Sequence, residues 1–408
     1  MIKESTETPT APLYVARQPV FDRNLSAWAC SLRFWETGLM KNEDPGGSLR
    51  LLVDVVSLAL PGTEAGRKLI VQLSPALLGY EFEQVLPADR LIIDLGSAIT
   101  ADERTVKACK RLKSAGLTLM AGDTVRRPEY RALLPYLDIV HYELPRPTDH
   151  LNAPIEGFRG QRMVSRVEDR EILTSILKLG FANFALFQGA FFSKPRIVSG
   201  RRPSTADVGK LRLMAELSRS DFSPARLASI LQADATLTLR LFNHVNSAEL
   251  AVRRKVASIQ HAITVLGETR TRSFLRVMLL TELSSGATSD ELVLLSVQRG
   301  RFLELVSATL PKPPLAPDSM FLVGLFSLLD AMMGIPLNDL VSNLPIDDPV
   351  KRMLLTPSNP WLLMLTAQER ARWDELERLQ GLTGLDPRRT ALLYLQASEW
   401  AVGVLSSR

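Results

Sequence analysis

The hydrophobic pattern of this chain changes period near its middle, and that change limits what the chain can fold into. From Tyr14 to Phe192, short apolar runs rich in β-branched residues alternate with segments of helical character. This alternation is typical of a parallel sheet wrapped by helices, and seven or eight such units predict an α/β domain built as a TIM-type (β/α) barrel. The runs of strand character are Tyr14–Phe21, Ala27–Trp35, Leu69–Leu73, Arg90–Leu95, Thr118–Ala121, Ile139–Glu143, Arg162–Val167 and Phe184–Gln188, the first two joined by a turn at Asp22–Asn24.

One crossover of the predicted barrel lacks the signals of a helix. The segment Leu144–Gly160 contains Pro145, Pro147 and Pro154 and shows no apolar stripe at helical spacing. Because repeated prolines break a helix, we expect a loop or a single turn there. One flank of the barrel would then be uncovered and available as a docking surface for another domain or subunit.

The second half of the chain is predicted to be all-helical. Apolar residues recur at helical spacing from Leu211 to Val404, and helix-start signals stand at Ser223-Pro224 and Asp386-Pro387. The sequence KPRIVSGRRPSTAD at residues 194–207 is rich in Pro, Gly, Ser and Arg and has no periodicity, as in a linker. We therefore expect a barrel domain over residues 1–195, a linker over 196–206 and an all-helical domain over 207–408.

The composition excludes several classes of protein. A chain of 408 residues with 46% hydrophobic and 23% charged residues is globular and long enough for two domains. The longest apolar stretch, Met320–Met333, is interrupted by Asp330 and is shorter than the roughly 20 residues that span a bilayer, so it is interpreted as a buried core helix. No apolar run follows the polar N-terminal segment, and we expect a cytoplasmic protein without a membrane partner. A net charge of +5 and one basic cluster, Arg253-Arg254-Lys255, do not favour nucleic-acid binding.

Four separated segments carry a family resemblance across nearly the whole chain. They are YVARQPVFDRN at residues 14–24, LFQGAFFSKP at 186–195, LQADATLTLRLFNHVNSA at 231–248 and SIQHAITVLG at 258–267. In this order they resemble the bacterial EAL–HDOD signalling proteins, in which an EAL barrel precedes an all-helical HDOD domain. The resemblance implies a site at the mouth of the barrel, where active EAL domains hydrolyse cyclic di-GMP with two metal ions.

The residues expected at that mouth depart from the pattern of the active enzymes. Two dications require several converging carboxylates, because Mg²⁺ gives up its hydration shell only to a dense set of anionic oxygens. By resemblance, a glutamate is replaced by Ser31 in SLRFW, an asparagine by Gln72, the lysine that orients water by His141, and a further glutamate by Ser165. The strand that should carry two glutamates keeps Asp94 at most. The remaining mouth positions are Trp35, Gly122, Asp123, Glu143, Glu168 and Gln188.

Two of these residues leave alternatives open. His141 is a substitute metal ligand or base, or a strand-end histidine with a hydrogen-bonded ring, and the second interpretation is favoured. Trp35 stacks a base or fills the core, and core filling is favoured.

The second half is related by resemblance to HD phosphohydrolases, which need paired histidines and an adjacent aspartate. The expected segment, Gly324–Asp330, has no histidine, and the half contains only His244 and His261. Two histidines do not make an HD metal site, and both are interpreted as core or helix-end residues.

On these grounds we expect a degenerate EAL barrel with no catalytic residue, no metal and no cofactor. The predicted protein is not an enzyme, and it regulates signalling by binding an unknown protein partner. The alternative is a receptor that binds cyclic di-GMP without hydrolysis, which is less favoured because no arginine or metal is expected to neutralise two phosphates. An active phosphodiesterase and a nucleic-acid-binding protein are favoured least, and an oligomer is compatible with the sequence.

Overall fold

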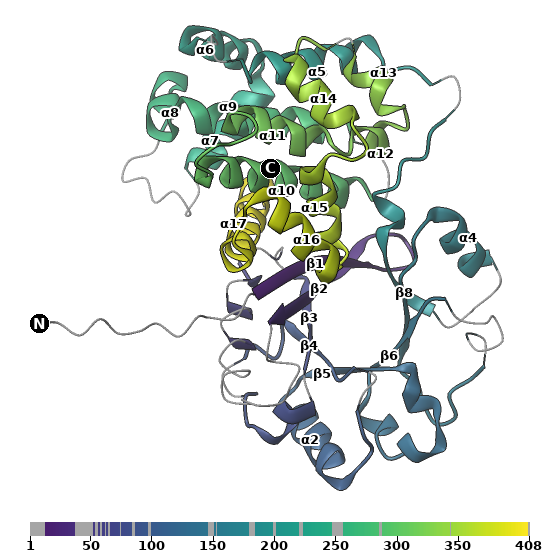
Figure 1. Ribbon diagram of the computed structural model, residues 1–408. Coiled ribbons are helices and arrows are strands. Elements are labelled where there is room, and N and C mark those ends of the chain that lie inside the picture. The colour runs from purple at the N-terminus through teal and green to yellow at the C-terminus, as the bar shows by residue number, and fades with distance from the viewer. Residues whose placement is uncertain are drawn as a thin grey trace, which may run out of the picture.

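The computed structural model contains a closed eight-stranded barrel with a helical region above it (Figure 1). It describes residues 13–36, 52–53, 56–57, 59–61, 63, 66–73, 75–83, 86–96, 99–145, 151, 153–178, 184–198, 201–219, 223–246, 256–284, 288–342 and 344–406. The predicted fold class, an α/β barrel followed by an all-helical region, is confirmed.

The eight strands follow one another around the barrel in chain order. Each predicted strand is present: β1 Leu13–Phe21, β2 Ala27–Glu36, β3 Lys68–Gln72, β4 Leu91–Asp94, β5 Thr118–Gly122, β6 Ile139–Glu143, β7 Gln161–Ser165 and β8 Phe184–Gln188. Strands β2 to β8 are parallel, whereas β1 is antiparallel to both β2 and β8 and closes the barrel. The structure departs from an all-parallel TIM barrel in this one strand.

The direction of β1 follows from the short turn that links it to β2. The Asp22 carboxylate accepts hydrogen bonds from the backbone N–H of Asn24 at 2.8 Å and of Ser26 at 3.0 Å. Parallel neighbours need a crossover of about a dozen residues, so a connection this short joins only antiparallel strands. The predicted turn at Asp22–Asn24 therefore fixes β1 as the antiparallel strand.

An apolar layer fills the barrel interior, with one residue from each strand. Its members, each no more than 1% exposed, are Val20, Ala29, Ile70, Ile92, Met120, Ile139, Met163 and Leu186. Layers of inward side chains of this kind make the inside of a small barrel a packed core and not a pore. This layer is the floor beneath the mouth of the barrel.

Few regular helices surround the described part of the barrel. Helix α2, Glu103–Ser114, connects β4 to β5, and helix α4, Arg170–Lys178, connects β7 to β8. Between β6 and β7, residues 153–160 contain no helix, as predicted for them, whereas Leu151 is helical. Residues 146–150 and 152 of that segment lie outside the described part of the chain. The docking role of this flank stays a prediction.

Between β2 and β3, residues 52–53, 56–57 and 59 are helical. Short 3₁₀ turns follow three other strands: η2 Pro75–Gly79 follows β3; η3 Asp123–Arg126, η4 Pro128–Tyr130 and η5 Leu134–Tyr136 follow β5; and η6 Ala190–Phe192 follows β8.

The helical region begins at Thr205 and contains the helix starts predicted at Ser223-Pro224 and Asp386-Pro387. Its helices are α5 Thr205–Glu216, α6 Pro224–Ala233, α7 Ala235–Val245, α8 Ile259–Leu266, α9 Glu268–Thr281, α10 Ser289–Thr309, α11 Pro317–Phe326, α12 Leu329–Met333, α13 Leu337–Val341, α14 Asp348–Leu355, α15 Pro360–Glu369, α16 Trp373–Thr383 and α17 Pro387–Ser406. Ser223 caps α6 by accepting a hydrogen bond from the Arg226 N–H at 3.2 Å. Asp386 caps α17 by accepting one from the Arg389 N–H at 2.7 Å.

The apolar stretch Met320–Met333 is buried but is not one continuous helix. It covers most of α11 and all of α12, with a break at Ser327 and Leu328. In the described chain, no helix combines the length and the apolar character that crossing a bilayer requires.

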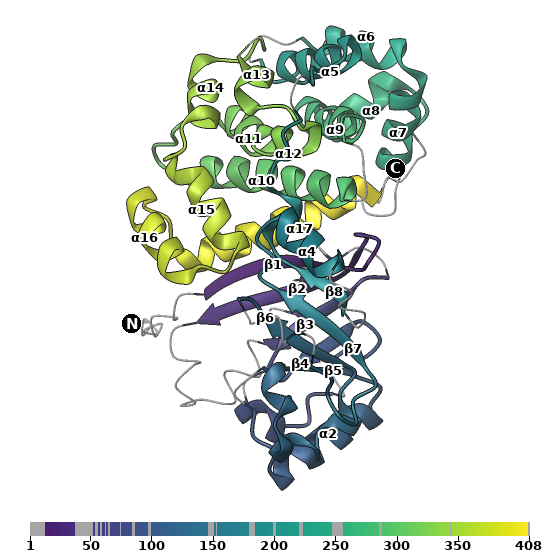
Figure 2. The same cartoon turned by 90° about the vertical axis from the view of Figure 1, so that its right-hand side faces the viewer.

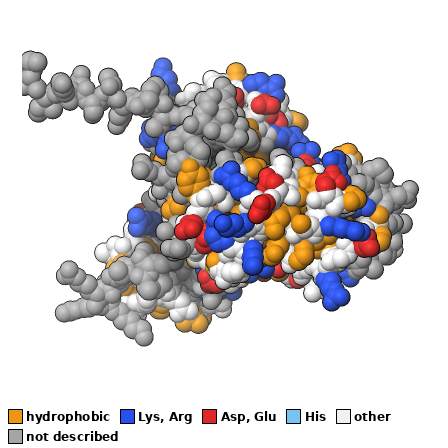
Figure 3. All heavy atoms as spheres, turned by 90° about the horizontal axis from the view of Figure 1, so that it is seen from below, with side chains coloured by type: hydrophobic (Ala, Val, Ile, Leu, Met, Phe, Trp, Pro, Cys, Tyr) orange, Lys and Arg blue, Asp and Glu red, His pale blue; other side chains and the backbone are white. Residues whose placement is uncertain are grey.

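The last helices of the chain join the helical region to the barrel. Helices α15 and α17 contact β1, and α17 also packs along α10 (Figure 2). Figure 3 views the molecule from the barrel end, away from this junction, and there basic and acidic side chains are interspersed around an apolar area. The antiparallel strand β1 is thus both a wall of the barrel and the contact surface for the helical region.

Replacing one member of the apolar floor tests its contribution to stability. Leu186→Ala removes a side chain that is 1% exposed and leaves a cavity, so the free energy of unfolding should fall by about 2–5 kcal/mol. Urea denaturation followed by circular dichroism measures the change. The control, Leu382→Ala, alters a side chain that is 79% exposed and should shift the value by no more than about 0.5 kcal/mol. Equal effects of the two substitutions would contradict a packed floor.

Candidate functional site

A polar layer lies directly above the apolar floor. Because successive side chains of a strand point to opposite faces, the residue two positions nearer the mouth faces the same interior. On the eight strands these residues are Gln18, Ser31, Gln72, Asp94, Gly122, His141, Ser165 and Gln188. All except Gln18 were predicted at the mouth from the sequence, so the structure brings the predicted positions together in one ring.

Hydrogen bonds connect members of this ring across neighbouring strands. His141 Nε2 and Ser165 Oγ are 2.5 Å apart, with the direction of the bond set by the imidazole tautomer. Gln188 Nε2 donates to Gln18 Oε1 at 2.9 Å, which ties β8 to β1. The Asp94 carboxylate accepts from the Gly96 N–H at 2.8 Å. These bonds satisfy buried polar groups that would otherwise destabilise the barrel.

His141 is held in its neutral form. Burial lowers its pKa below the usual 6.5, and the Arg33 guanidinium lowers it further, while Asp94, Glu143 and Asp123 act in the opposite direction. Desolvation is the largest of these causes, because the ring is only 9% exposed. A neutral imidazole next to a serine hydroxyl can accept a proton, so the base interpretation of His141 stays open.

Above the ring is a cavity of about 510 Å³, a volume typical of small-molecule sites. Five of the predicted residues line it: Gln72, Glu143, Ser165, Glu168 and Gln188. Ser31, Asp94, Gly122 and His141 lie in the polar ring, and Asp123 begins the turn η3 directly after β5. The side chain of Trp35 lies outside the described residues, so neither of its interpretations is tested.

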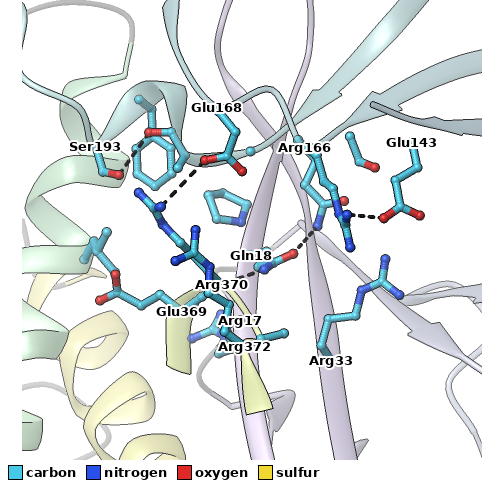
Figure 4. A pocket seen from close by; sticks show the side chains of 18 of the residues that line it. Arg17, Gln18, Arg33, Glu143, Arg166, Glu168, Ser193, Glu369, Arg370 and Arg372 are labelled. Atoms are coloured by element: carbon cyan, nitrogen blue, oxygen red, sulfur yellow. Dashed lines mark hydrogen bonds and ion pairs between the residues drawn. The ribbon is translucent and has the colours of Figure 1, made fainter. Parts of the chain in front are cut away.

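The cavity also contains arginines that the sequence did not reveal as a group. Its walls carry Arg17, Arg33, Arg166, Arg370 and Arg372 against Glu143, Glu168 and Glu369, a formal excess of two positive charges (Figure 4). Arginines therefore line the mouth, where the sequence was expected to supply none. These arginines come from three parts of the chain, residues 17–33, 166 and 370–372, which are more than a hundred residues apart, so no single motif contains them.

Each arginine side chain has a defined partner in the described structure. Arg33 Nη1 donates to Gln72 Oε1 at 2.6 Å. Arg166 Nε is 2.5 Å from Glu143 Oε1, and Arg370 Nη1 is 3.6 Å from Glu168 Oε2. These pairs are partly exposed, so each contributes little to stability and an anionic ligand can compete for the arginine.

Unusual backbone geometry is concentrated around the cavity. Among the described residues, three that are not glycine have a positive φ, and two of them, Arg166 at 56° and Ala371 at 53°, line the cavity. At Gly189, which also lines it, a Cβ atom would lie 2.1 Å from the Val167 carbonyl oxygen. Such backbone strain is maintained only where the surrounding structure enforces it, and it is commonest at ligand sites.

The donor set does not fit a pair of metal ions. Among the described residues, no three His, Cys, Asp or Glu side chains converge in a way that would hold a metal. Glu143 and Glu168 are directed to arginines, and Asp94 accepts a backbone N–H. We therefore derive no catalytic step that runs through a metal.

The two histidines of the helical region lie apart from the barrel mouth. His244, on α7, stacks on Phe274 with ring centroids 4.8 Å apart, and burial lowers its pKa. His261 is exposed in the first turn of α8. These positions agree with the core and helix-end interpretations.

The buried neutral histidine makes stability depend on pH. The pKa of His141 in the folded state lies below the unfolded value near 6.5. Between these two pKa values the unfolded state binds more protons than the folded state. The free energy of unfolding therefore falls as pH decreases from about 6.5 through the folded pKa. His244 acts in the same direction. We expect His141→Gln to remove its share of this loss, measured as a smaller drop in the urea midpoint between pH 7 and pH 5. A pH dependence unchanged from the parent chain would show that His141 is not held neutral.

Comparisons with known proteins add four findings. The HDOD domain model matches residues 203–333. YuxH of Bacillus subtilis is 26% identical over 97% of this chain and 100% of its own length. The cyclic di-GMP phosphodiesterase CdgJ of Vibrio cholerae is 26% identical over 98% of this chain and 94% of its own length. Among solved structures, the PaMucR phosphodiesterase bound to c-di-GMP aligns with 44% of this chain and 94% of its own, at 14% identity and a TM-score of 0.35.

One of these relatives contradicts a prediction made from the sequence. CdgJ matches almost the whole chain and is a phosphodiesterase, so the prediction that the chain is not an enzyme is wrong. That prediction counted ligand types missing at motif positions, and such a count does not establish that catalysis is lost.

The family assignment itself agrees with the sequence. The HDOD match, the two relatives that cover the chain from end to end and the closed barrel in front of the HDOD segment all fit the predicted organisation. The chain contains an HDOD domain at residues 203–333, behind a closed barrel, and is similar along nearly its whole length to YuxH and CdgJ.

Proposed function

We propose that the cavity at the barrel mouth binds cyclic di-GMP and that the chain works in cyclic di-GMP signalling. The observation that carries this proposal is the excess of arginines over glutamates in the cavity wall, five against three. The excess of two positive charges matches the two phosphates of a cyclic dinucleotide. Guanidinium groups suit this task because they donate several hydrogen bonds in a planar fork that fits phosphate oxygens.

Two further features support the same ligand. The wall also offers amide and hydroxyl groups, on Gln18, Gln72, Gln188 and Ser193, which suit the polar edges of a nucleobase. The relative CdgJ is named as a cyclic di-GMP phosphodiesterase.

We propose that the output of the site is contact with a protein partner. The identity of this partner and the oligomeric state of the chain stay predictions.

Isothermal titration calorimetry with cyclic di-GMP, in magnesium or calcium, tests the first proposal. We expect micromolar affinity, and we expect Arg33→Ala to weaken it about tenfold, because a charge-assisted hydrogen bond contributes about 1.5–3 kcal/mol and 1.4 kcal/mol is tenfold. The control Arg131→Ala removes an equal charge from an exposed position outside the cavity and should leave the affinity unchanged. The absence of binding heat with the parent chain would refute cyclic di-GMP binding.

Hydrolysis of the bound nucleotide is the second candidate, and the relative CdgJ favours it. The structure offers a proton acceptor for such a step, because neutral His141 is hydrogen-bonded to Ser165 and the Ser165 side chain lines the cavity. General-base catalysis by a positioned side chain typically contributes about 10²–10⁴-fold to the rate.

A linearisation assay separates this candidate from binding alone. If His141 is the base, His141→Gln should lower the rate of cyclic di-GMP linearisation by at least about 100-fold. The control His261→Gln changes an exposed histidine of the helical region and should leave the rate unchanged. Chromatography of the reaction products gives both rates. Linearisation that survives His141→Gln would exclude this base, and no linearisation by the parent chain would exclude the second candidate.

A further inference from the structure

The end of helix α15 rests on the mouth of the barrel through three consecutive residues. Gln368 Nε2 donates to the Val15 carbonyl oxygen at 3.1 Å. The backbone carbonyl of Glu369 accepts from Gln18 Nε2 at 2.9 Å. Arg370 forms the ion pair with Glu168 described above. The helical region therefore supplies part of the cavity wall itself.

A buried ion pair fixes the position of this helix end. Arg299, on α10, holds the Glu369 carboxylate with two hydrogen bonds, Nε to Oε1 at 2.7 Å and Nη2 to Oε2 at 2.6 Å. Both side chains are almost buried, at 9% and 12% exposed. Because Arg299 already satisfies the acid, the charge of Glu369 is offset within the helical region. The neighbouring Arg370 and Arg372 pair instead with Glu168 and Glu375, at the longer distances of 3.6 and 3.4 Å.

The turn after α15 places two arginines on the cavity wall. Ala371 takes the left-handed conformation, and the Arg372 N–H donates to the Ala367 carbonyl at 2.9 Å, which is the hydrogen bond of a Schellman helix end. The chain reverses at Ala371, and Arg370 and Arg372 on either side of it both line the cavity (Figure 4). Opposite them, the barrel contributes Arg33 and Arg166.

We propose that the nucleotide site is shared between the two parts of the chain, with Arg370 and Arg372 contacting one phosphate while Arg33 and Arg166 contact the other. This inference rests on the proposed function, because it adds residues of the helical region to the same site. A ligand held in this way fastens the helical region to the barrel. By linkage, the factor by which the ligand strengthens the contact between the two parts equals the factor by which that contact raises the affinity for the ligand. A change that separates the two parts therefore lowers the affinity.

The test compares two double variants of the full chain by calorimetry with cyclic di-GMP at one ionic strength. Arg370→Ala with Arg372→Ala removes both cations of the helical wall, and we expect affinity to fall at least about tenfold, or about 1.4 kcal/mol. Arg352→Ala with Arg378→Ala is the matched control, because it removes the same charge from exposed positions of the helical region outside the cavity. Its affinity should equal that of the parent chain.

A third variant changes the affinity in the opposite direction. Glu168→Gln frees Arg370 from its carboxylate and removes a negative charge from the wall, so affinity should rise about threefold, in line with the small free energy of a partly exposed ion pair. Circular dichroism and the thermal midpoint establish that all variants fold.

The outcomes separate this inference from the proposed function. A parent chain that binds no cyclic di-GMP refutes the proposed function and the shared site with it. Binding by the parent that Arg370→Ala with Arg372→Ala leaves intact refutes only the shared site. An equal loss in the two double variants also refutes the shared site, because it reveals a general effect of net charge.

Discussion

The ion pair between Arg299 and Glu369 determines where the helical region meets the barrel. Its two short hydrogen bonds fix the end of α15 in a nearly buried position, and the adjacent Gln368 and Arg370 then reach β1 and the barrel mouth. Breaking such a pair leaves a buried charge without compensation, which is strongly destabilising. The shape of the cavity is therefore set in part by an interaction between two residues of the helical region, one of which, Glu369, also accepts a hydrogen bond from Gln18 on β1.

The barrel and the floor of the site follow from local rules that a sequence displays. Strands such as Ile139–Glu143 and Phe184–Gln188 were predicted at their observed bounds, because period-two alternation and β-branched residues are local signals. The same period explains why the predicted mouth positions form one ring. Gln18 was not predicted at the mouth. Strand β1 runs in the opposite direction, so its mouth residue Gln18 precedes its floor residue Val20 in the chain instead of following it.

The cavity wall depends on geometry that the sequence does not display. Arg370 and Arg372 belong to the helical half, and only the packing of α15 on β1 brings them to the mouth. Arg166 and Ala371 take left-handed conformations that are usual for glycine, so no turn signal marked them. The missing acids at Ser31 and Ser165 were interpreted as lost catalysis, and the similarity of nearly the whole chain to the phosphodiesterase CdgJ contradicts that interpretation.

The apolar floor of the barrel has an electrostatic consequence. Eight buried apolar side chains, from Val20 to Leu186, form a region of low dielectric constant below the arginines. Field lines from the guanidinium groups avoid such a region and leave through the solvent-filled opening, where they attract anions from a distance and accelerate their capture. Dissolved salt shortens the range of this attraction to about 8–10 Å, so the capture rate should depend on ionic strength more steeply than the rate of release.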